Sequence, residues 1–443
     1  MTEIQTLYIN ILLYISLFIY CIVKYKWNNV CSFLSALYLG NSIFGLLLFI
    51  SPLYFFSESA QGTITIESVL YLFALNTLLI LAFKDVSIDN YKIISGYNEK
   101  FLTNIQYFLS FILSVVLLIR LPESFDYYHS SEDLADLRNE TYGFQDSHRG
   151  NFFILILQRL FGSTPILLLT ISTVNIILLN KKRFIDKYCI FLYLAYNLNL
   201  MLSNISRSVI IFVYFEILTI IILIQSYIEN RLRKKIIFYV IALGGIVYPI
   251  FSSITQARFS DDESDYIGYS TLRYAGESQL NFCGLLYQDL KEPFYGWNQF
   301  PLYRRIVGLD YDNGKAREDE GVTSMFIANK FHYPNPTYIF HGVAGTWFFN
   351  WGRVLTPVFF LLFYYLMTRK RKRVSPCISF INILVIIIAG SYVAKGVFYG
   401  DYSFESGNLL FFYIFLIWIY LRKYGSSKTI GFNKQNNTIR QSE

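Results

Sequence analysis

Apolar residues run along this chain in blocks of about 20, with polar segments between them, and the pattern predicts eleven membrane-spanning helices. A helix of about 20 apolar residues is long enough to cross the ~30 Å hydrocarbon core of a bilayer. The blocks cover residues 4–23, 30–50, 64–83, 103–119, 160–180, 188–204, 208–226, 236–254, 347–368, 376–395 and 405–421. The predicted fold class is therefore an all-α polytopic membrane protein.

Two of the polar segments are far longer than the roughly 2–8 residues usual between packed helices. They divide the chain into residues 1–119 with helices one to four, 120–151 as a first loop, 152–254 with helices five to eight, 255–346 as a large loop, 347–421 with helices nine to eleven, and 422–443 as a tail. Both loops carry mixed charge that leans acidic, which fits segments on the outer side of a membrane. We expect loop positions such as Ser278 to be accessible from outside.

Composition and charge support this class and set its orientation. Only 16% of the residues are charged, against about 25% in an average soluble domain. Of the 38 Lys and Arg residues, 23 lie in the short segments after helices one, three, five, seven and nine and in the tail. The short loops on the other side, 51–63, 205–207 and 396–404, carry only Arg207. The positive-inside rule therefore predicts an external N-terminus and a cytoplasmic C-terminus, and the +7 net charge does not indicate nucleic-acid binding.

The sequence has no strong motif for a disulfide framework, a metal or a nucleotide. Its five cysteines are scattered, and its four histidines lie in the long loops without the spacing of zinc ligands. Acidic clusters at 261–265 and 318–320 either bind a divalent cation weakly or form solvated charge runs. A glycine-rich phosphate loop and a G-x-S-x-G motif are both missing, so we expect no metal and no cofactor.

Arginines on the predicted outer side are the best candidates for a binding site. Arg207 stands in a short turn, where an arginine either snorkels to lipid headgroups or binds a ligand. The large loop contributes Arg258, Arg273, Arg304 and Arg305. Guanidinium groups bind phosphate oxygens through paired hydrogen bonds, so one hypothesis is a clamp for a lipid pyrophosphate. The alternative is that the loop arginines are surface residues that pair with nearby acids.

Aromatic residues in the large loop extend this hypothesis to sugars. Tyr295, Trp297 and Tyr303 lie close together in the sequence. They either stack on the apolar faces of sugar rings or anchor the loop at the membrane interface.

Several polar residues lie inside the apolar blocks, where interhelical hydrogen bonds are the usual explanation. They are Asn76, Asn175, Asn197, Asn199, Asn204 and Glu216. Glu216 is too far from Arg207 for a partner on the same helix face, so it needs a partner from another helix or a proton. Lys395 ends a block near the outer side and is a candidate for one more anion contact.

The layout resembles that of the Wzy-type polysaccharide polymerases, which join oligosaccharide repeat units in O-antigen and capsule pathways. The resemblance covers the whole arrangement of membrane helices with two large outer loops. Locally it rests on Ser206-Arg207-Ser208, Leu137-Arg138-Asn139-Glu140, and Asn335-Pro336-Thr337-Tyr338 leading to Phe349-Asn350-Trp351-Gly352. Asn350 stands where members of that family often carry an acid.

This resemblance implies a GT-C-like membrane glycosyltransferase at the outer face of the bacterial cytoplasmic membrane. A growing glycan would leave undecaprenyl pyrophosphate and join a second lipid-linked repeat unit. The outer arginines, with Arg138 among them, would stabilise the leaving pyrophosphate, and Trp297 would contact sugar. His332, or else His341, would take the hydroxyl proton. A chain-length regulator and a flippase are the implied protein partners.

Three other functions stay open from the sequence. An O-antigen ligase would use the same donor with another acceptor. A flippase or other transporter would handle the same lipid-linked glycan, although such proteins usually have short outer loops. A membrane scaffold would have no need for arginines gathered at one face.

Overall fold

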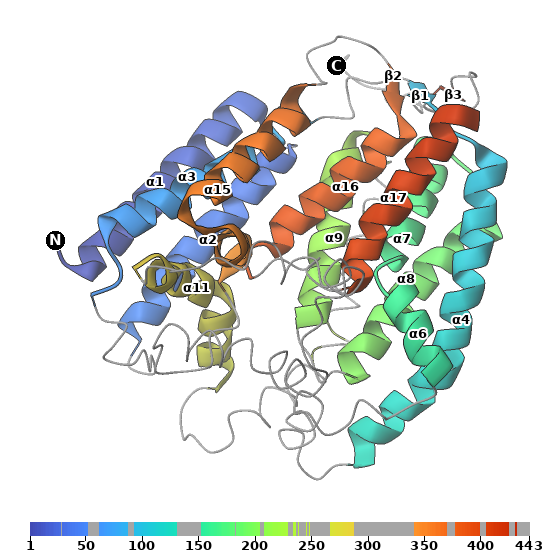
Figure 1. Ribbon diagram of the computed structural model, residues 1–443, viewed down its shortest axis with the longest axis horizontal. Coiled ribbons are helices and arrows are strands. Elements are labelled where there is room, and N and C mark those ends of the chain that lie inside the picture. The colour runs from blue at the N-terminus through green and yellow to red at the C-terminus, as the bar shows by residue number, and fades with distance from the viewer. Residues whose placement is uncertain are drawn as a thin grey trace, which may run out of the picture.

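Helices make up most of the computed structural model (Figure 1). The structure describes residues 1–27, 29–51, 62–86, 93–130, 152–181, 183–203, 208–228, 266–287, 341–369, 377–398, 405–424 and 430–431, with 234, 235, 238, 245 and 248 as isolated positions. Among the described residues, four helical segments are long and apolar enough to cross a membrane: α1 (Glu3–Tyr25), α2 (Val30–Ile50), Glu99–Phe125 of α4 (Glu99–Ser130) and Asn350–Arg369 of α15 (Gly342–Arg369). The described chain is thus an all-α membrane protein in its main architecture.

Four further apolar helices among the described residues are shorter. They are α3 (Ile66–Leu81), α7 (Pro165–Thr173) with its continuation η3 (Val174–Leu178), α9 (Ser208–Ile224) and α16 (Phe380–Lys395). The remaining described helices are α6 (Phe152–Phe161), α8 (Phe184–Ser203), the short η4 (Gln225–Tyr227), α11 (Tyr266–Tyr287) and α17 (Glu405–Tyr424). Helices therefore lie at ten of the eleven predicted blocks, and the block at 236–254 falls almost wholly outside the described residues. The number of eleven spans stays a prediction.

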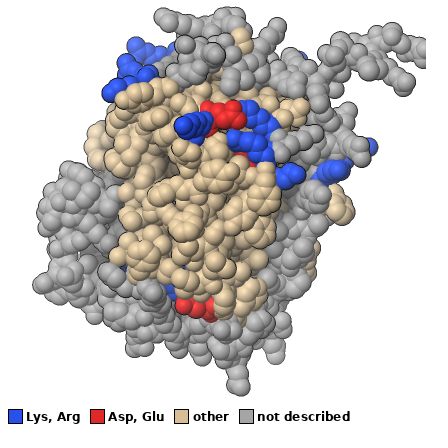
Figure 2. Space-filling model, turned by 90° about the vertical axis from the view of Figure 1, so that its right-hand side faces the viewer, with Lys and Arg blue, Asp and Glu red and all other residues tan. Residues whose placement is uncertain are grey.

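The sequence of α4 shows how the chain marks a membrane crossing. Charged residues stand at Glu99 and Lys100 and again at Arg120 and Glu123, while the stretch 101–119 has none. At 1.5 Å per residue this stretch is about 28 Å long, close to the thickness of the hydrocarbon core. Figure 2 shows a matching surface on this side of the molecule, with charged side chains near its upper and lower ends and an uncharged band between them.

The helices fall into two groups with a pair between them (Figure 1). The first group consists of α1, α2, α3, α11 and α15, and the second of α4, α6, α7, α8 and α17. Between them, α9 packs against both α2 and α8, and α16 packs against α2, α7, α9 and α17. Because α9 and α16 contact each other and both groups, they join the two halves of the bundle.

A small sheet lies at one end of the bundle (Figure 1). Its strands are β1 (Ile93–Ser95), β2 (Cys377–Ser379) and β3 (Ile430–Gly431), in the order β2-β1-β3. β1 pairs in parallel with β2 and antiparallel with β3. The charge pattern places β1 and β3 on the same side of the membrane, as their pairing requires. That this side is cytoplasmic stays a prediction. The prediction put β2 inside the block 376–395, whereas the structure begins this block with a strand and starts the helix only at Phe380.

Two helices differ from their predicted form. α4 continues to Ser130, past Pro122 and into the predicted first loop, and Arg120 pairs with Glu123 there at 3.1 Å. α15 is broken at Gly352, whose φ of 69° lies in the left-handed region that glycine adopts readily. The break lies near the start of Asn350–Arg369, the stretch of α15 that is long and apolar enough for a span, and a short helical part precedes it after His341.

Candidate functional site

The structure describes few of the site residues proposed from the sequence. His341 immediately precedes α15, and Arg273 lies on α11, although the Arg273 side chain is not among the described ones. The others lie outside the described residues: Arg138, Arg207, Arg258, Trp297, Arg304, Arg305 and His332. The arginine clamp therefore stays a prediction, and the described part of the site is built around α11 and the start of α15.

α11 carries polar side chains into the interior of the bundle. Glu277, Ser278, Gln279 and Asn281 are each at most 3% exposed. The helix packs mainly against α2 and also contacts α3 and α15. Sequence analysis placed this segment in an accessible outer loop, so the expectation for Ser278 is wrong. The reason is that the polar face of α11 finds hydrogen-bonding partners on apolar helices far away in the sequence.

A close helix crossing brings α11 into this position. A Cβ atom on Gly276 would overlap the backbone of Phe44 and Gly45 on α2, so the two helices touch there through their backbones. Glycine at such a crossing allows the closest approach of two membrane helices. The side chains that follow on α11 are therefore held against α2.

Neutral hydrogen bonds then connect α11 with the first two helices. The amide of Asn41 on α2 donates to the Ala275 carbonyl and, at 3.1 Å, to the Ser278 hydroxyl. On α1, the Asn10 amide donates to Gln279 Oε1 at 2.5 Å and to Ser42 Oγ at 2.9 Å. Since polar groups in hydrocarbon are costly when unpaired, these contacts explain why α11 can be buried.

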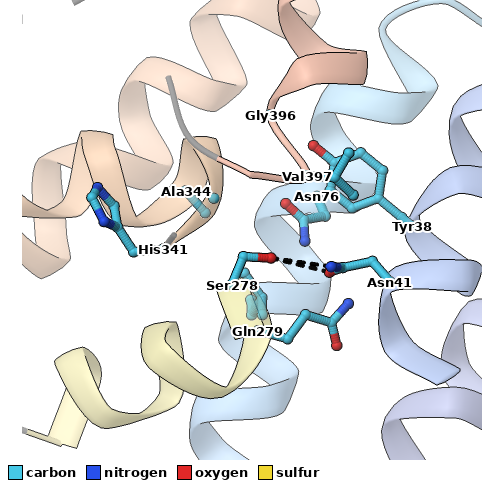
Figure 3. A pocket seen from close by; sticks show the side chains of 11 residues that line it. Tyr38, Asn41, Asn76, Ser278, Gln279, His341, Ala344, Gly396 and Val397 are labelled. Atoms are coloured by element: carbon cyan, nitrogen blue, oxygen red, sulfur yellow. Dashed lines mark hydrogen bonds between the residues drawn. The ribbon is translucent and has the colours of Figure 1, made fainter. Parts of the chain in front are cut away.

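A small pocket lies where α2, α3, α11 and the start of α15 meet (Figure 3). Its lining is formed by Tyr38, Asn41, Leu72, Asn76, Ser278, Gln279, His341, Gly342, Ala344, Gly396 and Val397. The amide Nε2 of Gln279 has no hydrogen-bond partner within the described part of the chain, although Gln279 is only 3% exposed. Asparagine, glutamine, serine and tyrosine side chains offer donors and acceptors without a fixed charge. The pocket lining therefore offers neutral hydrogen-bonding groups, and none of its described residues is a lysine or arginine that would pair with a pyrophosphate.

The volume limits what can enter this pocket. Sites for drug-sized ligands commonly measure about 300–1,000 Å³. The space inside the pocket that a water-sized molecule could occupy is about 10 Å³, so in this structure it holds about one water molecule and would have to widen before a sugar could enter.

His341 stands at the edge of the pocket, with its ring turned away from Asn41 and Asn76 (Figure 3). Its ring packs on Gly345, where a Cβ atom would come within 2.7 Å of the His341 Cβ. The Thr346 hydroxyl donates to the Gly342 carbonyl at 3.1 Å and lies 3.2 Å from His341 Nε2. The Thr346 hydroxyl therefore holds the His341 ring in place from the first turn of α15. An imidazole with a fixed orientation can act as a proton acceptor.

Sequence reasoning identified part of this site. It singled out His341 as a candidate base and Asn76 as a polar residue inside a span. Asn76 donates to the Tyr14 hydroxyl at 2.7 Å, which is the expected kind of interhelical bond. Sequence reasoning missed Asn10, Asn41 and Gln279. An asparagine inside each of the first two apolar blocks was a signal that could have identified Asn10 and Asn41. Their meeting with α11 depends on the tertiary structure.

No protein-family model matches the chain, and neither a curated protein nor a solved structure matches it. The class of protein is therefore assigned from the sequence and the structure of this chain alone. Its apolar helices, its uncharged surface band and its polar interior helix define a helical membrane protein with a neutral polar pocket.

Proposed function

We propose that this protein is a GT-C-like membrane glycosyltransferase that polymerises undecaprenyl-pyrophosphate-linked oligosaccharide repeat units. The reaction would take place at the outer face of a bacterial cytoplasmic membrane and yield O-antigen or capsular polysaccharide. The proposal rests on the resemblance to Wzy-type polymerases in helix layout, large polar segments and local motifs.

One structural observation supports it most. A helix of the large polar segment, α11, inserts its polar face among membrane helices and meets the start of α15 beside His341. An enzyme that joins a lipid-borne donor to a sugar hydroxyl needs such a place, where polar groups and a base lie within reach of the bilayer. A purely structural bundle has no need for a neutral polar pocket at this position.

The proposed chemistry assigns each group a role. A hydroxyl oxygen of the acceptor sugar attacks C1 of the sugar at the reducing end of the donor glycan. The bond between C1 and the pyrophosphate oxygen breaks, and undecaprenyl pyrophosphate leaves with the bonding electrons. After the pocket has widened and the ring has turned toward it, His341 takes the hydroxyl proton, while Asn41, Ser278 and Gln279 orient sugar hydroxyls. The predicted arginine clamp stabilises the charge on the leaving pyrophosphate.

The test is polymer formation by the purified protein in liposomes. Undecaprenyl-pyrophosphate-linked repeat units, extracted from a host that lacks the gene, serve as both donor and acceptor. We expect a ladder of glycan lengths from the wild type and a rate about 10²- to 10⁴-fold lower from His341→Ala, because that is the usual effect of losing a general base. Thr346→Val, which removes only the hydroxyl that orients the ring, is the matched control and should have a smaller effect.

Two results would contradict the proposal. The absence of a ladder from folded wild-type protein would exclude polymerisation of these units. A ladder that His341→Ala leaves unchanged would remove His341 from the mechanism. Transfer to lipid A core in place of a repeat unit would identify an O-antigen ligase.

A transporter of the same lipid-linked glycan is the second candidate. The break of α15 at Gly352 favours it, because discontinuous membrane helices often form the substrate sites of transporters. The two functions predict different products. A transporter moves intact repeat units across the liposome membrane, while a polymerase lengthens units that are already on the outer face.

A further inference from the structure

Lys395 and Glu216 form a buried ion pair between α16 and α9. Their side chains are 6% and 8% exposed, and the Lys395 ammonium contacts one carboxylate oxygen of Glu216. The Tyr193 hydroxyl on α8 donates to the other oxygen at 2.5 Å. Sequence analysis considered Lys395 as a contact for an anionic ligand. The structure instead provides Glu216 with the partner from another helix that it required.

Such a pair calls for an explanation beyond stability. Burying charged side chains within a bundle of membrane helices costs free energy. A buried ion pair often stabilises the folded protein no more than well-packed apolar residues would. A buried ion pair among membrane helices therefore suggests a functional role. The residues around Lys395 and Glu216 indicate what that role is.

Lys395 is followed directly by a turn of residues 396–398, which contacts the start of α15. The Phe398 carbonyl accepts a hydrogen bond from Gly342 N at 2.7 Å, and the Gly396 carbonyl accepts one from Val343 N at 2.8 Å. The first N–H groups of a helix have no partners within the helix itself, so the turn supplies them here. A Cβ atom on Gly396 would lie 2.8 Å from Val343 Cγ1, which shows how closely the two segments approach.

The same turn is held from its other side by α9 and α11. The Phe398 ring lies 5.9 Å from that of Phe212, 6.0 Å from that of Phe215 and 6.4 Å from that of Tyr274. The Lys395 ammonium also lies 5.2 Å from the centroid of the Phe212 ring. Lys395, just before the turn, and Phe398, its last residue, thus both contact α9 and hold the turn against that helix.

We infer that Lys395 and Glu216 are positioning residues, whose ion pair holds the 396–398 turn against α15 and thereby sets the place of His341 and of the pocket wall formed by Gly396 and Val397. The role of His341 rests on the proposed function, whereas the mechanical link between the pair and α15 does not. The link explains why a charged pair stands beside a pocket lined by neutral side chains.

The experiment measures opening at the start of α15 with a cysteine probe. Ala344, which is 1% exposed and lines the pocket, is changed to cysteine in a protein whose five native cysteines are replaced by alanine. N-ethylmaleimide reports how often this position opens. We expect Lys395→Met to label at least about tenfold faster than the parent, equivalent to about 1.4 kcal/mol of local opening free energy. Lys395→Arg, which keeps the charge, should label at the rate of the parent.

Two further variants distinguish a local effect on the 396–398 turn from a general loss of stability of the bundle. Gly396→Ala disturbs the turn without touching the charges and should also speed labelling. Arg183→Gln breaks another ion pair, with Asp186, far along the bundle and should leave labelling of the Ala344→Cys probe within about twofold. If Lys395→Met does not fold, the uncharged double variant Glu216→Gln/Lys395→Met replaces it, with the same expected increase.

The outcomes are distinct. Unchanged labelling in Lys395→Met or its replacement, or in Gly396→Ala, overturns the inference, as does an equal increase in Arg183→Gln. In the liposome assay Lys395→Met should lower kcat with little change in KM, and Lys395→Arg should restore it. If the wild type makes no polymer while the labelling result holds, the proposed function fails and the positioning role stands.

Discussion

Two buried polar networks in this molecule differ in charge and in how completely they are paired. The first lies between α4 and α8, where Arg183 donates to both oxygens of Asp186 and to Gln106 Oε1. Asp186 also accepts from Gln106 and Asn175 at 2.8 Å. The hydrogen bonds to Asp186 raise the pKa of Arg183, which stays charged. Each donor and acceptor in this set has its partner.

The second network, between α1, α2 and α11, is neutral and incompletely paired. Gln279 Nε2 and Asn10 Oδ1 are buried without a hydrogen-bond partner in the described part of the chain. A buried polar atom left unpaired costs about 1–3 kcal/mol, so such atoms are retained where water or a ligand can satisfy them. The comparison teaches that the charged network holds helices together, whereas the neutral one keeps bonding capacity available beside a pocket.

Breaking the charged network should have the largest effect on stability. Asp186→Asn removes a fully buried carboxylate and leaves Arg183, among the described residues, only the more distant Glu99 as an ionic partner, at 3.5 Å, which we expect to cost about 3 kcal/mol of unfolding free energy. Thermal unfolding in detergent measures it. Glu123→Gln is the control, because the Arg120–Glu123 pair is partly exposed and such a pair is worth at most about 1 kcal/mol. Equal losses of unfolding free energy in the two variants would show that the Arg183–Asp186 pair stabilises the protein no more than the partly exposed Arg120–Glu123 pair.

The crossing that places α11 should be the next most sensitive feature. Gly276→Ala forces the backbones of α2 and α11 apart, and we expect a loss of about 1–3 kcal/mol with a wider pocket. Gly40→Ala on α2 meets nothing within 4 Å and should be neutral, or stabilising by up to about 1 kcal/mol. Comparable unfolding temperatures for both variants would contradict the close crossing.

The neutral network should respond least in stability and most in function. Gln279→Leu leaves Asn10 bonded to Ser42 and should change the unfolding free energy by less than about 1 kcal/mol. Under the proposed function it should raise KM for the lipid-linked repeat unit by roughly tenfold, the equivalent of one hydrogen bond. Ser114→Ala, which loses a bond to Tyr188, is a control for stability alone. A destabilised Gln279→Leu with normal KM would assign Gln279 to structure only.

The candidate site could be predicted only in part. The sequence suggests His341 as the second candidate base after His332, because an imidazole suits proton transfer near neutral pH. The arginines and His332 proposed with it lie outside the described residues, apart from the backbone of Arg273, and their roles stay predictions. Gln279 gave no such signal, because its importance depends on Asn10, 269 positions away in the chain.

What the sequence by itself determined is that the chain is built from apolar helices, four of which, among the described residues, are long enough to cross a membrane. A run of about 20 apolar residues in a bilayer can satisfy its backbone only as a helix, so each block is informative without its neighbours. The tertiary structure alone decided that α11 enters the bundle, that α15 breaks at Gly352 and that Lys395 pairs with Glu216. Each of these depends on polar or glycine contacts between residues distant in sequence, and their free energy exists only once the helices have packed together.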